Sequence, residues 1–246
     1  MSKPPRRLAT GVFQVGAGGA NAFLIDLDEH GWPAAGEGTT AGGLVLIDTG
    51  VDKDAKRIGQ AIRDLGRTPA DLRGVVITHF HGDHIGGLAK VKQCTSAEVW
   101  MHPADAALVR AGVSRRELQG GPGVFRTILA RQINRRPAKP REPIAVEHEV
   151  GDGEILPFAG LRAIHTPGHS AGHLALLLPR DGGVLFAGDA ATNFLRLGNG
   201  PIHEDVAEGE RSLHKLAALD FDLAAFAHGR PIRGGAGERF RARWLI

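Results

Sequence analysis

Short apolar runs alternate with amphipathic stretches along the whole chain. Two stretches in the first half place apolar residues at helical spacing, which predicts helices over 52–65 and 104–111, and a further helix begins within 85–91. The β-branched and apolar runs between them are typical of strands, and they cover 11–15, 22–27, 44–47, 72–78 and 97–101. A Gly-rich stretch over 31–43 indicates a loop.

The second half repeats this alternation. Apolar periodicity predicts helices over 124–133 and 205–219. The predicted strands cover 144–150, 161–165, 174–178 and 183–187, and 223–227 is expected to be the last strand. Strands that alternate with helices in both halves favour an α/β protein in which helices cover the sheets.

Composition fits a soluble globular protein, with 42% hydrophobic and 23% charged residues in a chain of 246. We expect one domain over 1–246, without a signal peptide or transmembrane span, and therefore a cytoplasmic protein that does not contact a membrane. The single cysteine, Cys94, excludes an internal disulfide and a cysteine-based metal site, and we expect it to be a small core residue.

Positive charge is concentrated in one segment, although the whole chain carries only +3. Between 110 and 141 there are nine Lys or Arg residues and one acid, Glu117. We interpret 112–143 as a lid-like insertion, and call it the basic segment. Its arginines either attract an anionic substrate or form the solvated face of an extra helix. It contains one aromatic residue, Phe125, which argues against a stacking surface for nucleic acid.

Histidines and acids cluster where predicted strands end. In HFHGDH, the residues His79, His81 and Asp83 share one face if this segment is extended, and Gly82 would let the backbone bend so that His84 also turns inward. Pro167 and Gly168 would aim His169 away from its strand.

The remaining candidates are Asp189 after one strand and His228 after another. Imidazole and carboxylate groups are the zinc ligands available without thiolates, and seven of them suit two ions rather than one tetrahedral ion. We expect His102, His165 and His173 to have structural or supporting roles, and residues 193–195 to reach the pocket.

These motifs resemble those of the metallo-β-lactamase superfamily over roughly residues 11–230. The motifs are LIDTG at 46–50, HFHGDH at 79–84, TPGHS at 166–170, AGD at 187–189 and AHG at 227–229. The resemblance implies a four-layered αββα sandwich. It also implies one metal held by His79, His81 and His169, a second held by Asp83, His84 and His228, a bridging Asp189, and Asp48 supporting the histidine loop.

The implied activity is that of a dinuclear metal-dependent hydrolase, with two zinc ions or alternatively iron or manganese. A bridging hydroxide would attack an ester, lactone or thioester of a small molecule, and Asp83 would accept a proton. The motif set resembles glyoxalase II and lactonases rather than true β-lactamases, which the resemblance implies lack the bridging Asp. Only 18 residues follow His228, which argues against glyoxalase II, and the absence of Tyr argues against lactonases.

Three alternatives remain open from the sequence. A phosphodiesterase or nuclease would use the same ligands with a phosphoryl substrate. A mononuclear iron oxidoreductase similar to persulfide dioxygenases would use them with oxygen, because imidazole suits both metals. A non-catalytic scaffold would be expected to have degraded ligands, and these are intact. Substrate identity and oligomeric state are not encoded in any pattern we recognise.

Overall fold

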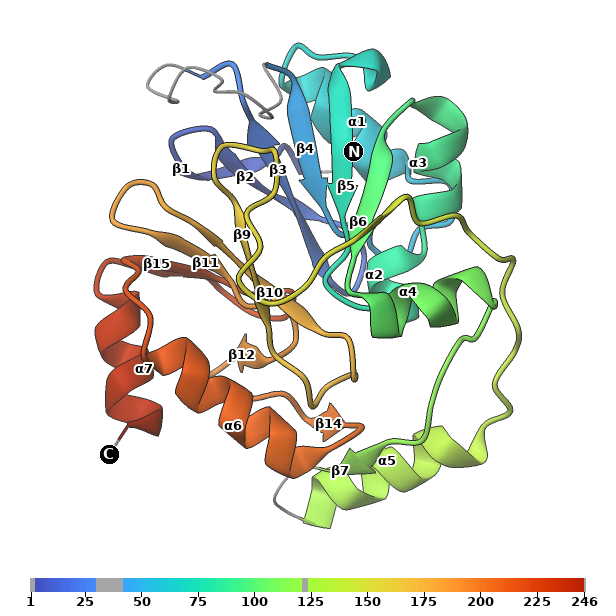
Figure 1. The fold of residues 1–246 in the computed structure, drawn as a ribbon, viewed down its shortest axis with the longest axis vertical. Helices are drawn as coiled ribbons and strands as arrows, with labels where there is room; N and C mark the ends of the chain where they lie inside the picture. The colour runs from blue at the N-terminus through green and yellow to red at the C-terminus, as the bar shows by residue number, and fades with distance from the viewer. Residues whose placement is uncertain (1–2, 30–41, 121–123, 246) are drawn as a thin grey trace.

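Two β-sheets face each other and helices cover their outer faces (Figure 1). The computed structural model describes residues 3–29, 42–120 and 124–245, so most of the loop predicted over 31–43 lies outside the described residues. This arrangement confirms the αββα sandwich expected from the sequence. None of the described helices has the length and apolar character needed to cross a bilayer.

The first sheet has the strand order β1-β2-β3-β4-β5-β6-β8. Its strands are β1 (Arg6–Ala9), β2 (Val12–Gly16), β3 (Asn21–Asp26), β4 (Leu44–Ile47), β5 (Leu72–Val76), β6 (Glu98–Met101) and β8 (His148–Glu149). The helices that accompany it are α1 (Lys56–Asp64), η1 (Pro69–Asp71), α2 (Gly82–Ile85), α3 (Leu88–Cys94) and α4 (Pro103–Arg110).

The second sheet has the order β16-β15-β11-β10-β9. Its strands are β9 (Arg162–His165), β10 (Leu174–Leu178), β11 (Val184–Phe186), β15 (Leu223–Ala225) and β16 (Ile232–Arg233), and it is covered by α6 (Val206–Ala217) and α7 (Ala236–Trp244). There are also two small ladders. One pairs β12 (Ala191–Asn193) with β13 (Leu197–Asn199). The other pairs β7 (Gln119–Gly120) with β14 (Ile202–His203) and lies next to α5 (Val124–Arg135).

Three apolar cores follow from strands that are buried on both faces. In β4, Val45 and Ile47 point into the core between the sheets, whereas Leu44 and Leu46 pack against the helices of the first layer. In β10, Leu176 faces the inter-sheet core and neighbouring side chains face α6 and α7. Since side chains alternate along a strand, continuous apolar runs are what a sheet covered on both sides requires.

Most predicted elements are confirmed to within a few residues, with some exceptions. The strand predicted over 144–150 is limited to His148–Glu149, and 223–227 is not the last strand because β16 and α7 follow it. Strand β1, the short helix η1 and the ladders that involve β7, β12, β13 and β14 were not predicted. Cys94 is exposed at the end of α3, so the expectation of a core cysteine is wrong.

Parallel pairing brings the ends of several strands to one edge of the sandwich. In the first sheet β4 and β5 are parallel, and in the second sheet β11 and β15 are parallel. The segments after their carboxyl ends carry Asp48, His79, Asp189 and His228. Ligands and catalytic groups commonly collect at such an edge, and this edge contains the site described below.

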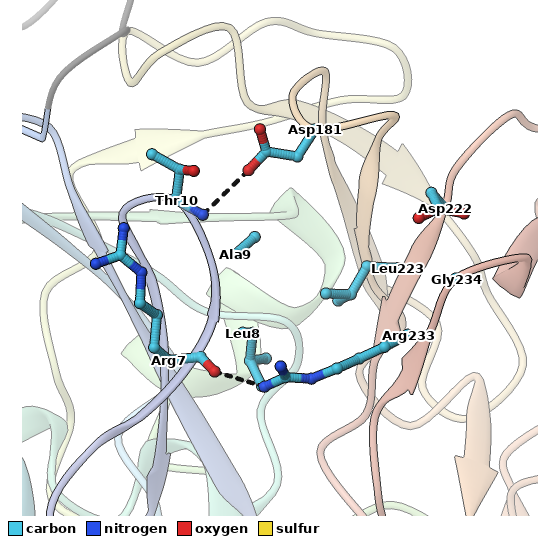
Figure 2. A pocket seen from close by; sticks show the side chains of 9 residues that line it. All are labelled: Arg7, Leu8, Ala9, Thr10, Asp181, Asp222, Leu223, Arg233 and Gly234. Carbon is cyan, nitrogen blue, oxygen red and sulfur yellow. Dashed lines mark hydrogen bonds between the residues drawn. The ribbon is translucent and has the colours of Figure 1, made fainter.

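The opposite end of the sandwich is joined by a polar seam between the two sheets (Figure 2). The backbone N–H of Thr10 donates to Oδ2 of Asp181 at 3.0 Å, and the Arg233 guanidinium donates to the carbonyl of Arg7. These contacts connect the β1–β2 turn to the β10–β11 turn and to β16. The seam therefore lies far from the strand ends that carry the histidines.

Candidate metal centre

The HFHGDH segment leaves β5 as an extended chain and then forms a short helix. His81 has extended backbone angles and precedes α2, so Asp83 and His84 lie in a helical turn. The expectation that Asp83 shares a strand face with the two histidines before it is therefore wrong. The helical turn, rather than a flexible Gly82, brings His84 inward. As a result the side chain of His84 is fully buried, while that of Asp83 stays partly exposed.

The first group of candidate ligands comprises His79, His81 and His169, whose ligand atoms all lie within 4.8 Å of one another. Nε2 of His169 lies 2.9 Å from Nδ1 of His81 and 3.1 Å from Nε2 of His79. Burial lowers the pKa of all three rings, and the neighbouring histidines lower those of His79 and His81 further. The group therefore presents neutral imidazoles, the form that binds metal.

The second group comprises Asp83, His84 and His228, again with ligand atoms within 4.8 Å of one another. Nε2 of His228 lies 3.2 Å from Oδ2 of Asp83. Burial lowers the pKa of His84, but nearby carboxylates outweigh it and raise that pKa to about 9. Burial also lowers the pKa of His228, and its hydrogen bonds to Asp189 and Asp83 raise it to about 10. Without metal, this group is therefore an imidazolium–carboxylate cluster.

Asp189 faces both groups. Its Oδ2 lies 3.5 Å from Nε2 of His169 and 3.3 Å from Nε2 of His228, and its Oδ1 lies 3.5 Å from Nε2 of His84. Burial raises the pKa of Asp189, but the surrounding imidazoles lower it well below the usual range, so the carboxylate is ionised. One buried anion thus stands between ligands from the two sheets.

Asp48 supports the histidine loop, as the resemblance implies. Its Oδ2 accepts hydrogen bonds from Nδ1 of His84 and Oγ1 of Thr78, both at 2.8 Å, and its Oδ1 accepts from the Thr78 N–H at 2.8 Å. Asp48 is buried and holds a left-handed backbone with φ 58°. A non-glycine residue in that region carries strain, which commonly persists where a site depends on it.

The other ring nitrogens of His169 and His228 are also occupied. Nδ1 of His169 donates to the carbonyl of Ile202 at 2.9 Å, and Nδ1 of His228 donates to the carbonyl of Gly19 at 3.1 Å. Each bond fixes a tautomer that leaves Nε2 free to face the centre. Residues 17–20 and β14 therefore orient ligands that belong to distant segments.

His102, His165 and His173 lie near the centre without joining either group. Nε2 of His173 accepts a hydrogen bond from the Asp189 N–H at 3.0 Å, so this ring positions the shared carboxylate. His165 bonds the carbonyl of Ala171 at 2.9 Å and stacks on His102, with the ring centroids 4.0 Å apart. Their predicted role as supporting residues agrees with these contacts.

Sequence reasoning missed Asp105 in α4, a buried carboxylate that ties two ligand segments together. Its Oδ2 accepts from the Phe80 N–H at 3.1 Å and from Oγ of Ser170 at 2.6 Å, and its Oδ1 accepts from the Gly172 N–H at 2.8 Å. Phe80 lies between His79 and His81, and Ser170 follows His169. No sequence signal identifies it, because one acid on an amphipathic helix is normally solvated.

Exposed apolar side chains surround the second group. The ring of Phe194 stacks on His228 with the centroids 6.2 Å apart, and Leu195 is fully exposed beside it at the β12–β13 turn. Val51 is also exposed, and its backbone N–H bonds Ala17 at the start of the loop that orients His228. The expectation that residues 193–195 approach the pocket is consistent with the position of Phe194.

The basic segment forms α5, β7 and the connections around them. In α5, Val124 and Ile128 are exposed, whereas Ala130 is buried. The side chain of Phe125 lies outside the described residues.

The donor set fits metal ions. Nε2 of His84 and Oδ1 of Asp189 are buried, lie 3.5 Å apart and have no hydrogen-bond partner among the described residues. Unpaired buried polar atoms are costly in native proteins, and two of them side by side indicate a ligand that satisfies both. Imidazole nitrogens and carboxylate oxygens are donors that suit divalent transition metals.

Comparison with known proteins agrees with this geometry. A family model described as the metallo-beta-lactamase superfamily matches residues 15–228. The solved structure of the MIM-2 metallo-beta-lactamase superposes with a TM-score of 0.68 at 25% identity, over 98% of this chain and 81% of that chain.

Two curated relatives extend the comparison. Lactamase-like protein aptB of Emericella nidulans is 28% identical over 195 residues, which are 76% of this chain and 48% of the relative. A hydroxyacylglutathione hydrolase of Pseudomonas aeruginosa is 30% identical over 151 residues, which are 60% of this chain and 43% of the relative. The matched regions thus span about half the length of these relatives.

Proposed function

The chain belongs to the metallo-β-lactamase superfamily of metal-binding hydrolases, and on that premise we propose that it is a dinuclear hydrolase of a small ester, lactone or thioester. The observation that carries the proposal is the position of Asp189, whose two oxygens face His169 of the first group and His84 of the second. A carboxylate in that position suits a bridge between two ions.

His79, His81 and His169 would hold one ion, and Asp83, His84 and His228 the other. Two bound divalent ions supply a water of lowered pKa and a Lewis acid that polarises a carbonyl. We propose zinc because the ligands are imidazoles and carboxylates. The chain's own contribution is to supply ionised carboxylates and imidazoles as ligands. Asp48, His173 and Asp105 would fix the orientation of these ligands.

Asp83 is the candidate for proton transfer. Burial raises its pKa, but the hydrogen bond from His228 and the charge of His84 lower it well below the usual range, so it is ionised at neutral pH. Its side chain is 38% exposed, against 8% for Asp189, so it is the carboxylate of the centre that substrate can reach. We propose that it accepts the proton of the hydroxyl group that adds to the carbonyl and passes that proton to the leaving group.

The apolar rim supports an acyl substrate. Phe194 is exposed and stacks on His228, and Leu195 beside it in the chain and Val51 next to Gly18 are exposed as well; an acyl chain or ring of a substrate would bury Phe194. The similarity to a hydroxyacylglutathione hydrolase is in keeping with a thioester among the candidates.

Metal analysis combined with a substrate panel tests the proposal. Purified protein is expected to contain about two zinc ions per chain and to hydrolyse at least one of an ester, a lactone and a thioester. Asp189→Ala should lose metal and turnover, whereas Asp220→Ala, at a fully exposed carboxylate, should change neither. One iron per chain with oxygen uptake on a persulfide would refute the proposal, and so would activity on phosphodiesters alone.

A further inference from the structure

The basic segment leaves and re-enters the fold at one point. The Arg141 N–H donates to the carbonyl of Gly112 at 2.9 Å, and the Ile144 N–H donates to the carbonyl of Val109 at 3.3 Å. Gly112 has φ 68°, and a Cβ there would overlap the carbonyl of Arg141, so glycine is required at this closure. The backbone of Arg141 is therefore fixed at the base of the segment.

The same segment is attached to both ligand loops. Residues 119–120 of β7 pair with β14, and Ile202 of β14 accepts the hydrogen bond that orients His169. At its other end, the Arg141 side chain reaches the HFHGDH loop, where its Nη1 donates a long hydrogen bond to the carbonyl of Phe80 at 3.5 Å. The basic segment thus contacts residues of both loops that carry the ligands of the first group.

The guanidinium of Arg141 lies against Gly82. A Cβ at Gly82 would overlap Nη2 of Arg141, so the glycine between His81 and Asp83 leaves the space that the guanidinium occupies. Arg141 is half-buried, and the acidic charge that acts on it is that of Asp83. Among the described residues no carboxylate forms an ion pair with it, so most of its five N–H donors lack a protein partner.

Most other arginines of this region are engaged elsewhere or exposed, and the half-buried Arg126 lines a separate pocket with Phe194 and Trp244. Arg110 pairs with Glu149, Arg116 lies 3.9 Å from Glu204, and Arg115 bonds the carbonyl of Arg136. Arg131 is exposed on α5. Arg141 differs from all of these because its guanidinium lies beside a loop of candidate metal ligands, and most of its N–H groups have no protein partner among the described residues.

We propose that Arg141 binds a carboxylate of the substrate, so that the enzyme prefers esters, lactones or thioesters whose acyl part carries a negative charge. This inference rests on the proposed function and names its substrate class. A planar guanidinium matches a carboxylate with two parallel hydrogen bonds, and partial burial strengthens them. Its place beside Asp83 puts the charged end of the acyl part next to the candidate metal centre.

A matched pair of ligands tests the proposal without relying on turnover. Glutaramate and valeramide share a five-carbon acyl chain, and only the first carries a carboxylate. Calorimetric titration of the protein with its native metal should show that Arg141→Ala weakens glutaramate binding roughly 10- to 100-fold, the range for truncating a charged hydrogen-bond partner, and leaves valeramide unchanged. Arg141→Lys should fall between, because it keeps the charge and loses the fork.

Kinetics on the corresponding 4-nitrophenyl esters, the hydrogen glutarate and the valerate, give a second readout. Arg141→Ala should raise KM for the glutarate ester with little change in kcat, and the exposed Arg131→Ala should have the wild-type preference. Equal effects of Arg141→Ala on the charged and neutral ligands, or equal effects of Arg131→Ala and Arg141→Ala, would overturn the proposal. Glutaramate binding that depends on Arg141 without hydrolysis of either ester would instead refute the proposed function.

Discussion

Asp105 gives the sharpest test of how the two ligand loops are held together. Its carboxylate is fully buried and accepts hydrogen bonds from Phe80, Ser170 and Gly172. In Asp105→Asn the amide offers one oxygen and one NH₂ group to these three donors. The Ser170 hydroxyl can rotate and accept instead, but in either amide orientation one backbone N–H loses its acceptor.

The expected cost of Asp105→Asn follows from that unpaired group. A buried donor without a partner costs roughly 1–3 kcal/mol, so the free energy of unfolding should fall by about 2 kcal/mol. Ser170→Ala removes one of the three donors and should cost about 1 kcal/mol. Supporting residues of metal ligands typically contribute roughly 10- to 100-fold to metal affinity, and Asp105→Asn should weaken it by that factor.

Guanidinium denaturation of the metal-free variants measures the stability, and competition with a chromophoric chelator measures the metal affinity. Asp220→Asn, at a carboxylate whose side chain is fully exposed, is the matched control and should stay within roughly 0.5 kcal/mol of wild type. If Asp105→Asn is as stable as that control and binds metal as tightly as wild type, the reasoning about Asp105 is wrong.

Further predictions follow from the site. In the metal-free protein the pKa values of His84 (about 9) and His228 (about 10) lie above the unfolded value, so the contribution of these two rings to stability should be fully present below about pH 6.5 and be lost as pH rises towards 10. Metal uptake at pH 7.5 should release protons from these two rings, which calorimetry in two buffers detects. A stability that does not change between pH 6.5 and 10 would contradict the assignment of these pKa values. Gly188→Ala should reduce stability and metal affinity, measured by denaturation and chelator competition, because φ is 53° and a Cβ would lie 2.5 Å from Nε2 of His173; wild-type affinity would count against it. Phe194→Ala should raise KM for long-chain acyl esters about fivefold, the loss of roughly 1 kcal/mol of apolar burial, and an unchanged KM would exclude contact with the acyl chain.

The sequence predicted that these candidate ligands gather at one place because they follow strand ends. His79, Asp189 and His228 each come directly after an apolar run, and parallel pairing places such ends at one edge. The apolar runs themselves predicted the strands of both sheets, because a strand that is covered on both faces is apolar at nearly every position.

Some residues that support the candidate ligands, such as Asp105, could not be predicted, because tertiary contacts decide their roles. Asp105 is spaced like a solvated helix residue and is buried only because the loop after His169 packs on α4. Gly82 suggested a bend, whereas it leaves space for Arg141, which is 59 positions away along the chain (141 − 82). Helix α7 was missed because few apolar residues, among them Ala236 and Phe240, anchor an otherwise charged segment.

The closure between Gly112 and Arg141 has a consequence for how such enzymes diversify. A segment whose two ends meet can be lengthened, shortened or exchanged without moving the chain on either side, because the gap to be spanned is one hydrogen bond of 2.9 Å. The ligand loops lie outside this closure and belong to the sheets. Evolution or a designer can therefore vary much of residues 113–140 as a cassette while the candidate ligands keep their places, provided that the pairing of residues 119–120 with β14 is kept.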